Sequence, residues 1–261
     1  MQMNPPVLKY YEVADRVSAF STTRKGGVSC GCYGGFNVNA FCGDDETHVT
    51  ANRRLLAKEL GVAEDRLIIP HQTHGIESRM IAEEFFGLPG RGRQMLLEGI
   101  DCVMTDVPGV CIGVSTADCI PLLFYDRAHH AAAAVHAGWR GTLNKIAHKA
   151  VVEMHHCFKT VPQDVVAVIG PGISLANFEV GQEVYEQFAQ LGNDMERIAK
   201  MYDKWHIDLP ECNRLQLVEA GVPERQILSA GICTYDHCDE FFSARRLGIE
   251  SGRIYTGIVL R

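Results

Sequence analysis

Long hydrophobic segments are missing from this sequence. No apolar run reaches the roughly 18 residues that a membrane-spanning helix requires, and the mean hydropathy is -0.04. The amino terminus, MQMNPPVLKYYEVADRV, also lacks the basic start and the apolar stretch of a secretory signal. We therefore expect a chain that is neither embedded in a membrane nor exported, and we predict a cytoplasmic location.

Positive charge is scarce as well. The formal net charge is -7, from 25 Lys and Arg against 32 Asp and Glu, and the pI is near 5.9. This balance gives no general attraction for nucleic acid phosphates or for acidic lipids. The composition favours a small-molecule partner and excludes nucleic acid and membrane surfaces as expected partners.

Cysteine, in contrast, is abundant, with ten residues. Because no secretory signal is present, these residues are predicted to be reduced thiols, small buried side chains or metal ligands, and not a disulfide framework. Internal repeats and low-complexity linkers are absent, since Pro and Gly are scattered as turn residues. A length of 261 residues is within the range of one large β-containing domain. We expect a single domain over residues 1–261.

Short apolar runs bounded by turn residues predict buried strands. These runs lie at 67–69, 110–114, 120–125, 131–135, 165–169, 227–232 and 254–260. Apolar residues that recur three and four positions apart predict helices, at 46–60, 142–158, 181–191 and 209–220. This mixture indicates the α/β (α+β) class, a single layered domain with a mixed β-sheet and outer helices.

Residues at the ends of these elements refine the expectation. Asp44 and Asp45 can cap the first helix, and Gly61 can end it. Pro210 suits the first turn of the last helix. The polar, glycine-rich segment 18–39 is predicted to be a loop that closes over a site.

Three polar segments directly adjoin the apolar strands, where a fold can present ligands on a rigid frame. They are HQTHG at 71–75, STADC at 115–119 and VHAGWRG at 135–141. Imidazole and thiolate together suit zinc, and three protein ligands with a vacant fourth position are typical of a catalytic zinc site. This pattern predicts a zinc held by His74, Cys119 and His136, and His71 is a further histidine of the first segment.

Spacing alone leaves other interpretations open. Histidines beside strands are commonly hydrogen-bonded structural residues, and a cysteine beside IPLLF can be a small buried residue. Cys119 and His136 could also form a metal-free nucleophile and base pair, as in a cysteine hydrolase or deamidase. A further alternative is a folded partner-binding module without catalytic activity.

The order of several longer motifs resembles one known family. TTRKGGVS, HQTHG, ADCIPLLF, VHAGWRGT, IGPGIS and FFSARR occur in the order seen in the YfiH/YlmD family, also called the laccase domain or polyphenol oxidoreductase family, which includes FAMIN. The resemblance runs from about residue 18 to the carboxyl terminus. It implies a YfiH-like fold and places the family's metal ligands on His74, Cys119 and His136.

The resemblance also implies an activity. Members of the family look like zinc-containing purine nucleoside phosphorylases, which act on adenosine, inosine, guanosine and methylthioadenosine, combined with adenosine deaminase activity. Zinc in a dry cleft lowers the pKa of a bound water to about 7, which would serve attack at C6 of adenosine. Catalytic roles then fall on Cys119, His136 and Asp118, where Asp118 would shuttle protons. Asp101 is a second candidate for that shuttle, although a structural role suits it better.

One position departs from the family pattern. Where the family commonly reads SLNLGxHVGD, this chain reads GFNVNAFCGDD, so that Phe41 replaces a usual histidine. The older name of the family describes copper-dependent oxidation of phenols. A multicopper mechanism needs several histidine-rich clusters, and neither the His129/His130 pair nor the His155/His156 pair has suitable neighbours. Copper and laccase-like oxidation therefore remain the less favoured alternative to zinc.

Phosphorolysis requires an anion site, for which guanidinium groups are the natural ligands. Arg24 is the first candidate, because the backbone amides of Gly26 and Gly27 could approach the same anion. Arg140 and Arg245 are the next candidates for phosphate. Asn37 is predicted to hold the base or the ribose.

Overall fold

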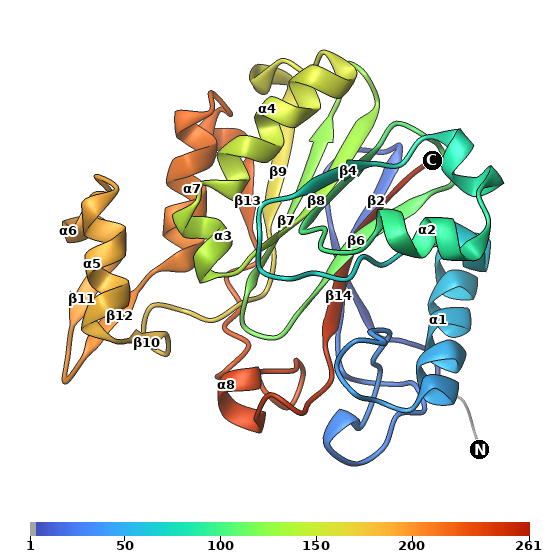
Figure 1. Cartoon of the computed structure of the whole chain (residues 1–261), viewed down its shortest axis with the longest axis horizontal. Helices are drawn as coiled ribbons and strands as arrows, with labels where there is room; N and C mark the ends of the chain where they lie inside the picture. The colour runs from blue at the N-terminus through green and yellow to red at the C-terminus, as the bar shows by residue number, and fades with distance from the viewer. Residues whose placement is uncertain (1–3) are drawn as a thin grey trace.

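Two large β-sheets form the centre of the molecule, a computed structural model that describes residues 4–261 (Figure 1). The five-stranded sheet has the order β1-β2-β14-β6-β3. Its strands are β1 (Leu8–Tyr11), β2 (Val17–Thr22), β3 (Leu67–Ile68), β6 (Cys111–Thr116) and β14 (Ile254–Leu260). Only β3 is parallel to its neighbour, so this sheet is mixed.

The six-stranded sheet has the order β13-β9-β7-β8-β5-β4 and is mixed as well. Its strands are β4 (Ser78–Met80), β5 (Cys102–Thr105), β7 (Ile120–Asp126), β8 (Ala131–Ala137), β9 (Val165–Ile169) and β13 (Ile227–Ser229). The chain passes from one sheet to the other between β6 and β7. This short connection brings polar residues to a point where both sheets end.

Helices lie on the outer faces of the two large sheets and at the side of the molecule (Figure 1). They are α1 (Glu46–Leu60), α2 (Gly90–Leu96), α3 (Trp139–Leu143), α4 (Ile146–Phe158), α5 (Gln182–Gln190), α6 (Met195–Ile198), α7 (Leu209–Glu219) and α8 (Ala244–Leu247). In Figure 1, α4 and α7 lie on the six-stranded sheet and α1 lies beside the five-stranded sheet. None of the helices within residues 4–261 is both long and apolar enough to cross a membrane.

Strand β7 shows how the layers pack. Leu122 and Phe124 point into the core shared with α4, whereas Leu123 and Tyr125 point into the core between the two sheets. This alternation follows from the two-residue period of a strand. Because both faces of β7 are covered, every one of its residues is buried and the strand reads as a continuous apolar run.

A smaller three-stranded sheet has the order β10-β12-β11, with strands β10 (Glu179–Val180), β11 (Ala199–Met201) and β12 (Trp205–Ile207). It lies with α5 and α6 at one side of the molecule (Figure 1). The ring of Trp205 stacks on Tyr185 of α5 with centroids 3.8 Å apart. Short 3-10 turns complete the structure at Gly31–Tyr33, Glu64–Arg66, Glu83–Gly87, Pro162–Asp164 and Glu224–Gln226.

The predicted α/β (α+β) class with outer helices is confirmed, and several elements agree closely with the prediction. Helix α1 has the predicted bounds, Asp45 caps it through the backbone N–H of Thr47, and Gly61 ends it in the left-handed region. Strands β9 and β14 also have the predicted bounds. Pro210 lies in the first turn of α7, as expected.

The loop prediction for 18–39 was wrong at its beginning. Residues 18–22 belong to β2, which pairs with β1 on one side and β14 on the other. Their polar composition suggested a loop, but the Ser21 hydroxyl bonds the Thr256 hydroxyl of β14 at 2.7 Å, and both residues are buried. Paired hydroxyls can lie inside a sheet because each satisfies the other.

The helix predicted over 142–158 was also wrong as a continuous element. Lys145 has φ 57°, in the left-handed region, and separates α3 from α4. Helix α7 packs against this break, where the buried side chain of Gln216 donates to the backbone carbonyl of Thr142 at 2.6 Å. The break lets α3 follow the end of β8 while α4 packs on the sheet. The prediction also omitted β1, β4, β5 and the three-stranded sheet, whose strands have two to four residues.

Candidate metal centre

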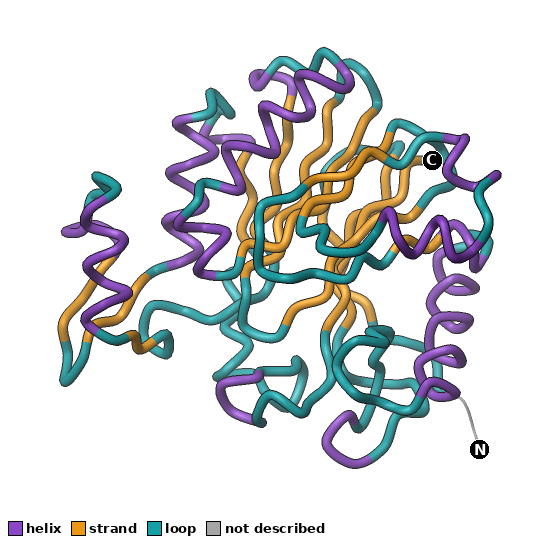
Figure 2. The backbone as a smooth tube through the Cα atoms, in the orientation of Figure 1, coloured by secondary structure: helices purple, strands orange, loops and turns teal. Residues whose placement is uncertain are grey.

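Three segments far apart in the sequence meet where the two sheets end. His74 lies in the loop between β3 and β4, Cys119 lies in the connection between β6 and β7, and His136 is the penultimate residue of β8. Because Pro121 pairs with His136 across the β7–β8 ladder, the antiparallel register brings Cys119 beside the end of β8. Figure 2 shows the loops that gather at this edge of the sheets.

The donor atoms of His74, Cys119 and His136 all lie within 4.8 Å of one another. Ligands of one tetrahedral zinc lie about 3.5 Å apart, given Zn–N of about 2.0 Å and Zn–S of about 2.3 Å. Small side-chain rotations therefore suffice for the three residues to share an ion. This is the one group of its kind among residues 4–261. The structure thus brings together the three residues that the sequence analysis singled out.

Asp101 organises the backbone around this group. It precedes β5 and is fully buried. Its carboxylate accepts hydrogen bonds from the backbone N–H groups of Thr73, His74 and Gly75, at 3.3, 3.1 and 2.7 Å. His74 has φ 62°, a conformation that costs a non-glycine residue free energy and needs support from its surroundings. Asp101 provides that support, which fits the structural role expected for it.

The same carboxylate orients His136. Oδ1 of Asp101 lies 2.7 Å from Nδ1 of the His136 ring, and both residues are buried. When Nδ1 carries the proton, Nε2 keeps its lone pair for a metal. Burial alone would raise the pKa of Asp101, but the bond to His136 and the backbone donors outweigh it and lower that pKa. A histidine that binds zinc through one ring nitrogen usually donates the N–H of its other ring nitrogen to a carboxylate or a carbonyl. Asp101 lies where such a carboxylate would support His136.

Cys119 and His136 also change one another's ionisation. Burial would raise the pKa of the Cys119 thiol, but the neighbouring rings of His136 and His74 lower it to about 6. Burial would lower the pKa of His136, but Cys119 and Asp101 raise it to about 9. These shifts favour a thiolate, which is the form in which cysteine binds a metal.

Gly138 leaves room for the donor atoms. A Cβ at this position would lie 3.1 Å from Sγ of Cys119 and 3.1 Å from Cδ2 of His74. Its φ of -68° is ordinary, so the backbone conformation itself does not require glycine. The close approach explains the glycine in HAGWRG, because a side chain would crowd the ligands.

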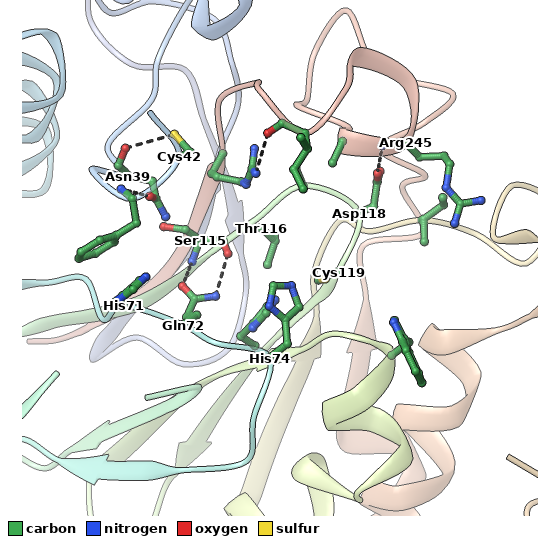
Figure 3. Close-up of a pocket in the computed structure, with 18 of the residues that line it drawn as sticks. Asn39, Cys42, His71, Gln72, His74, Ser115, Thr116, Asp118, Cys119 and Arg245 are labelled. Carbon is green, nitrogen blue, oxygen red and sulfur yellow. Dashed lines mark hydrogen bonds between the residues drawn. The ribbon is translucent and has the colours of Figure 1, made fainter. Parts of the chain in front are cut away.

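A cavity of about 610 Å³ opens beside the three residues, which all line it (Figure 3). This volume is within the range of pockets for small ligands, roughly 300–1,000 Å³. Asp118 and Arg245 line the cavity too. The other polar and aromatic residues of the wall include Asn39, Gln72, Ser115, Thr116, Trp139, Phe178 and Arg253.

Three predicted substrate residues lie outside the wall of this cavity. Arg24 donates to the carbonyls of Cys238 and Gly34 at 2.7 and 3.4 Å. Asn37 is buried, and its side-chain amide binds the Asp44 carboxylate at 2.8 Å. Arg140 packs its guanidinium over the Trp139 ring at 4.2 Å. The side chains of Arg24 and Asn37 thus hold protein segments together, whereas that of Arg140 packs on its neighbour in the sequence.

Asp118 and Arg245 do meet at the cavity (Figure 3). The carboxylate of Asp118 accepts from the hydroxyl of Thr234 and from the backbone N–H of Arg245, both at 2.7 Å. Asp118 has φ 83°, so these two bonds hold the unusual backbone that presents Cys119. The Arg245 guanidinium uses one donor on the carbonyl of Glu179 and packs over Phe178. Its other N–H groups remain available to a ligand.

The sequence analysis missed several residues of the cavity wall. Gln72 makes a two-way bond to the backbone of Ser115, at 2.8 Å in both directions, and so joins the loop of His74 to the end of β6, which leads to Cys119. Its position inside HQTHG was the available signal. Arg253 also lines the cavity and braces its own loop through the carbonyl of Ile249. No motif marked Arg253, because its place depends on the fold of the last loop.

His71 is not one of the three clustered donors His74, Cys119 and His136, although it lines the same cavity. Its Nδ1 is 2.7 Å from the Glu98 carboxylate, and its ring stacks on Phe41 with centroids 4.2 Å apart. Phe41 is the residue that departs from the family pattern. The loop after β2 reaches the cavity through Asn39, Phe41 and Cys42, of which only Asn39 belongs to the predicted loop 18–39.

This chain is similar to known proteins over most of its length. The family model described as multi-copper polyphenol oxidoreductase laccase matches residues 18–261. A purine nucleoside phosphorylase of Bacteroides thetaiotaomicron is 48% identical over 247 residues, which are 94% of this chain and 92% of that protein. Adenosine deaminase RL5, from an unknown prokaryotic organism, is 41% identical over 96% of this chain and 97% of its own. The crystal structure of a hypothetical protein YfiH of Bacillus licheniformis superposes with a TM-score of 0.91 at 30% identity, covering 98% and 97% of the two chains.

Proposed function

Since the chain belongs to the multi-copper polyphenol oxidoreductase laccase family, which includes YfiH, we propose that it is a zinc-dependent purine nucleoside phosphorylase that also deaminates adenosine. The family and the enzymatic nature of the chain agree with the prediction from the sequence motifs. The proposed substrates are adenosine, inosine, guanosine and methylthioadenosine together with phosphate. A cytoplasmic location and a single domain stay predictions.

One observation supports the proposal above the others: two imidazoles and one thiolate converge on one wall of a small-molecule cavity. The donor set fits zinc, because nitrogen and sulfur ligands in a group of three leave a coordination position for a reactant. The space kept by Gly138 and the Asp101 bond to His136 fit the same interpretation. A zinc held by these residues would supply Lewis-acid chemistry to a bound substrate or water.

The chain's own residues would divide the remaining work. Arg245 is the proposed phosphate ligand, since its guanidinium lines the cavity and keeps free donors. Asp118 directly precedes Cys119, and its carboxylate accepts from the Thr234 hydroxyl and the backbone N–H of Arg245, so we assign it a positioning role. Asp101 keeps the proton on Nδ1 of His136. Phosphorolysis would convert adenosine and phosphate to adenine and ribose 1-phosphate, and deamination would convert adenosine and water to inosine and ammonia.

The test is turnover by metal-loaded protein. Zinc-loaded wild type is incubated with adenosine and phosphate, and adenine, inosine, hypoxanthine and ribose 1-phosphate are followed by chromatography. Cys119→Ala and His74→Ala should lose both bound zinc and product formation. Cys233→Ala, which removes another partly buried thiol outside this cavity, should retain both. Absence of turnover by zinc-loaded wild type would contradict the proposal.

A second candidate is supported by one geometric feature. Asp101, His136 and Cys119 stand in contact in the order of an orienting carboxylate, a base and a nucleophile. This arrangement would suit a metal-free cysteine hydrolase or deamidase. Metal analysis separates the candidates: protein purified without added ions that holds stoichiometric zinc supports the first, whereas metal-free protein whose Cys119 reacts with iodoacetamide supports the second.

A further inference from the structure

One side of the metal cavity is an aromatic wall. Phe41 and His71 both line the cavity, and their rings stack at 4.2 Å with an interplanar angle of 20°. In Figure 3, His71 and Arg245 lie on opposite sides of His74. The cavity thus has the Phe41–His71 pair on one side and Arg245, packed over Phe178, on the other, with the three candidate metal ligands between them (Figure 3).

The aromatic wall is held in place before any ligand arrives. His71 is bound at its ring by Glu98, and its backbone N–H and carbonyl bind the backbone of Leu97 and Ile100 at 3.0 and 3.2 Å. The backbone N–H of Phe41 donates to the side chain of Asn39 at 2.6 Å. A wall that is ordered in advance costs a ligand little conformational entropy on binding.

Core packing does not account for Phe41. The residue remains 51% exposed, although it carries a large apolar ring. The stacked pair also lines a second cavity, but that cavity is lined by Arg53, Glu64 and Asp65 as well and contains none of the three candidate metal ligands. An exposed aromatic ring beside a metal group is a surface on which a flat ligand ring can stack.

We propose that the Phe41–His71 pair binds the purine ring of the substrate by stacking, so that Phe41 is a nucleoside-binding residue of this chain. This inference rests on the proposed function and names the wall of the cavity that takes the base. A purine has an apolar face of about the size of the Phe41 ring system, and stacking of a base on an aromatic side chain contributes to binding without requiring hydrogen bonds. Arg245, on the opposite side, then faces the phosphate.

The experiment measures equilibrium binding and turnover separately. Titration calorimetry gives the affinity of zinc-loaded protein for adenosine, for wild type and for Phe41→Leu, Phe41→Tyr and Tyr202→Leu. Leucine keeps an apolar side chain but removes the flat ring, whereas tyrosine keeps the ring. Tyr202 is the matched control, because it is 48% exposed and its ring also contacts a histidine, His206, outside the metal cavity.

Stacking predicts that Phe41→Leu weakens adenosine binding about tenfold, that Phe41→Tyr stays within about twofold of wild type, and that Tyr202→Leu has no effect. In turnover assays the KM for adenosine should rise in Phe41→Leu, while the KM for phosphate stays unchanged. Wild-type affinity in Phe41→Leu, or no adenosine binding by wild type, would overturn the inference. Adenosine binding without turnover in wild type would contradict the proposed function alone, and the affinities of the variants would still decide the stacking.

Discussion

The two ends of the β7–β8 hairpin carry similar pairs of residues with different consequences. At one end, Asp101 accepts from the His136 ring and from the backbone N–H groups of a loop. At the other end, Asp126 accepts from the His129 ring at 2.8 Å and from the backbone N–H groups of Ala128 and His129. Both aspartates are fully buried. Only the first end has a cavity with two further donors.

The difference lies in what the histidine can reach. The His136 side chain is 3% exposed and faces Cys119 and His74, whereas the His129 side chain is 39% exposed and closes a turn. A buried aspartate bonded to a histidine therefore stabilises both ends of this hairpin. It becomes a candidate site only where other segments of the chain bring additional ligands to the free ring nitrogen.

Replacing His136 should have the largest effect, and replacing His129 is the control. His136→Ala deletes a proposed metal ligand, so zinc content after dialysis should fall from about one ion per chain to near zero, and nucleoside turnover should be lost with it. His129→Ala should leave zinc content and turnover at wild-type levels. Metal analysis by mass spectrometry and a turnover assay measure both. Equal zinc content in the two variants would show that the two ends do not differ as described.

Exchanging each of the two aspartates for asparagine tests whether a carboxylate beside His136 strengthens metal binding. Asp101→Asn cannot hold the Nδ1 proton of His136 with a charge, and loss of such a partner weakens metal affinity by about 10- to 100-fold. Asp126→Asn should leave metal affinity unchanged. Competition with a chromogenic chelator measures the zinc affinity of both variants. An Asp101→Asn protein that binds zinc as wild type does would place the support of His136 elsewhere.

Replacing Gly138 should have a smaller effect, confined to the end of the hairpin that carries His136. Gly138→Ala places a methyl group 3.1 Å from both Cys119 and His74, so the ligands must move by a few tenths of an ångström. Displacements of this kind at a reacting centre are expected to lower turnover about three- to tenfold. Gly90→Ala is the matched control, since a Cβ there meets nothing within 4 Å. Equal activity of the two variants would show that the ligands accommodate the methyl group.

The three candidate metal ligands meet in the structure, whereas three of the candidate substrate residues lie outside the cavity, and this difference has a physical reason. His74, Cys119 and His136 adjoin apolar strands, so the strand pattern itself indicated that they could meet at one edge. The function of Arg24 could not be judged locally, because its guanidinium binds the carbonyl of Cys238, 214 residues away. The place of Arg253 depends on the last loop of the chain. Long-range partners of a side chain leave no trace in its own neighbourhood.

The fold shows the same limit. Elements with a strong period or a cap, such as α1, were predicted with their bounds, whereas β2 was assigned to a loop because Ser21 and Thr22 are polar. Those hydroxyls are satisfied by β14 and by the backbone of Tyr255, which follow more than 230 residues later. The break at Lys145 likewise depends on α7, which no local pattern around 142–158 could reveal.

The turn end should show a pH-dependent contribution to stability that does not involve the candidate metal ligands. Burial would raise the pKa of Asp126, but the Thr160 side chain, the His129 ring and the backbone N–H groups of the turn outweigh it, and the pKa is lowered. A carboxyl whose pKa is lower in the folded than in the unfolded state stabilises the fold fully above the unfolded value, about 3.9, and loses this contribution as the pH falls through the folded value. Asp126→Asn should therefore reduce the free energy of unfolding by about 1–3 kcal/mol at pH 7. The difference from wild type should shrink below about pH 4.

Urea unfolding of metal-free protein from pH 7 to pH 3 measures this difference, and Asp208→Asn provides the control of opposite sign. Burial raises the pKa of Asp208, so its ionisation opposes folding, and its contribution improves as the pH falls. Subtracting each variant from wild type cancels the titration of Asp101, which remains in all three proteins. A stability difference for Asp126→Asn that stays constant down to pH 3 would mean that the turn needs the shape of this side chain and not its charge. The two ends of the hairpin would then differ in electrostatics as well as in ligands.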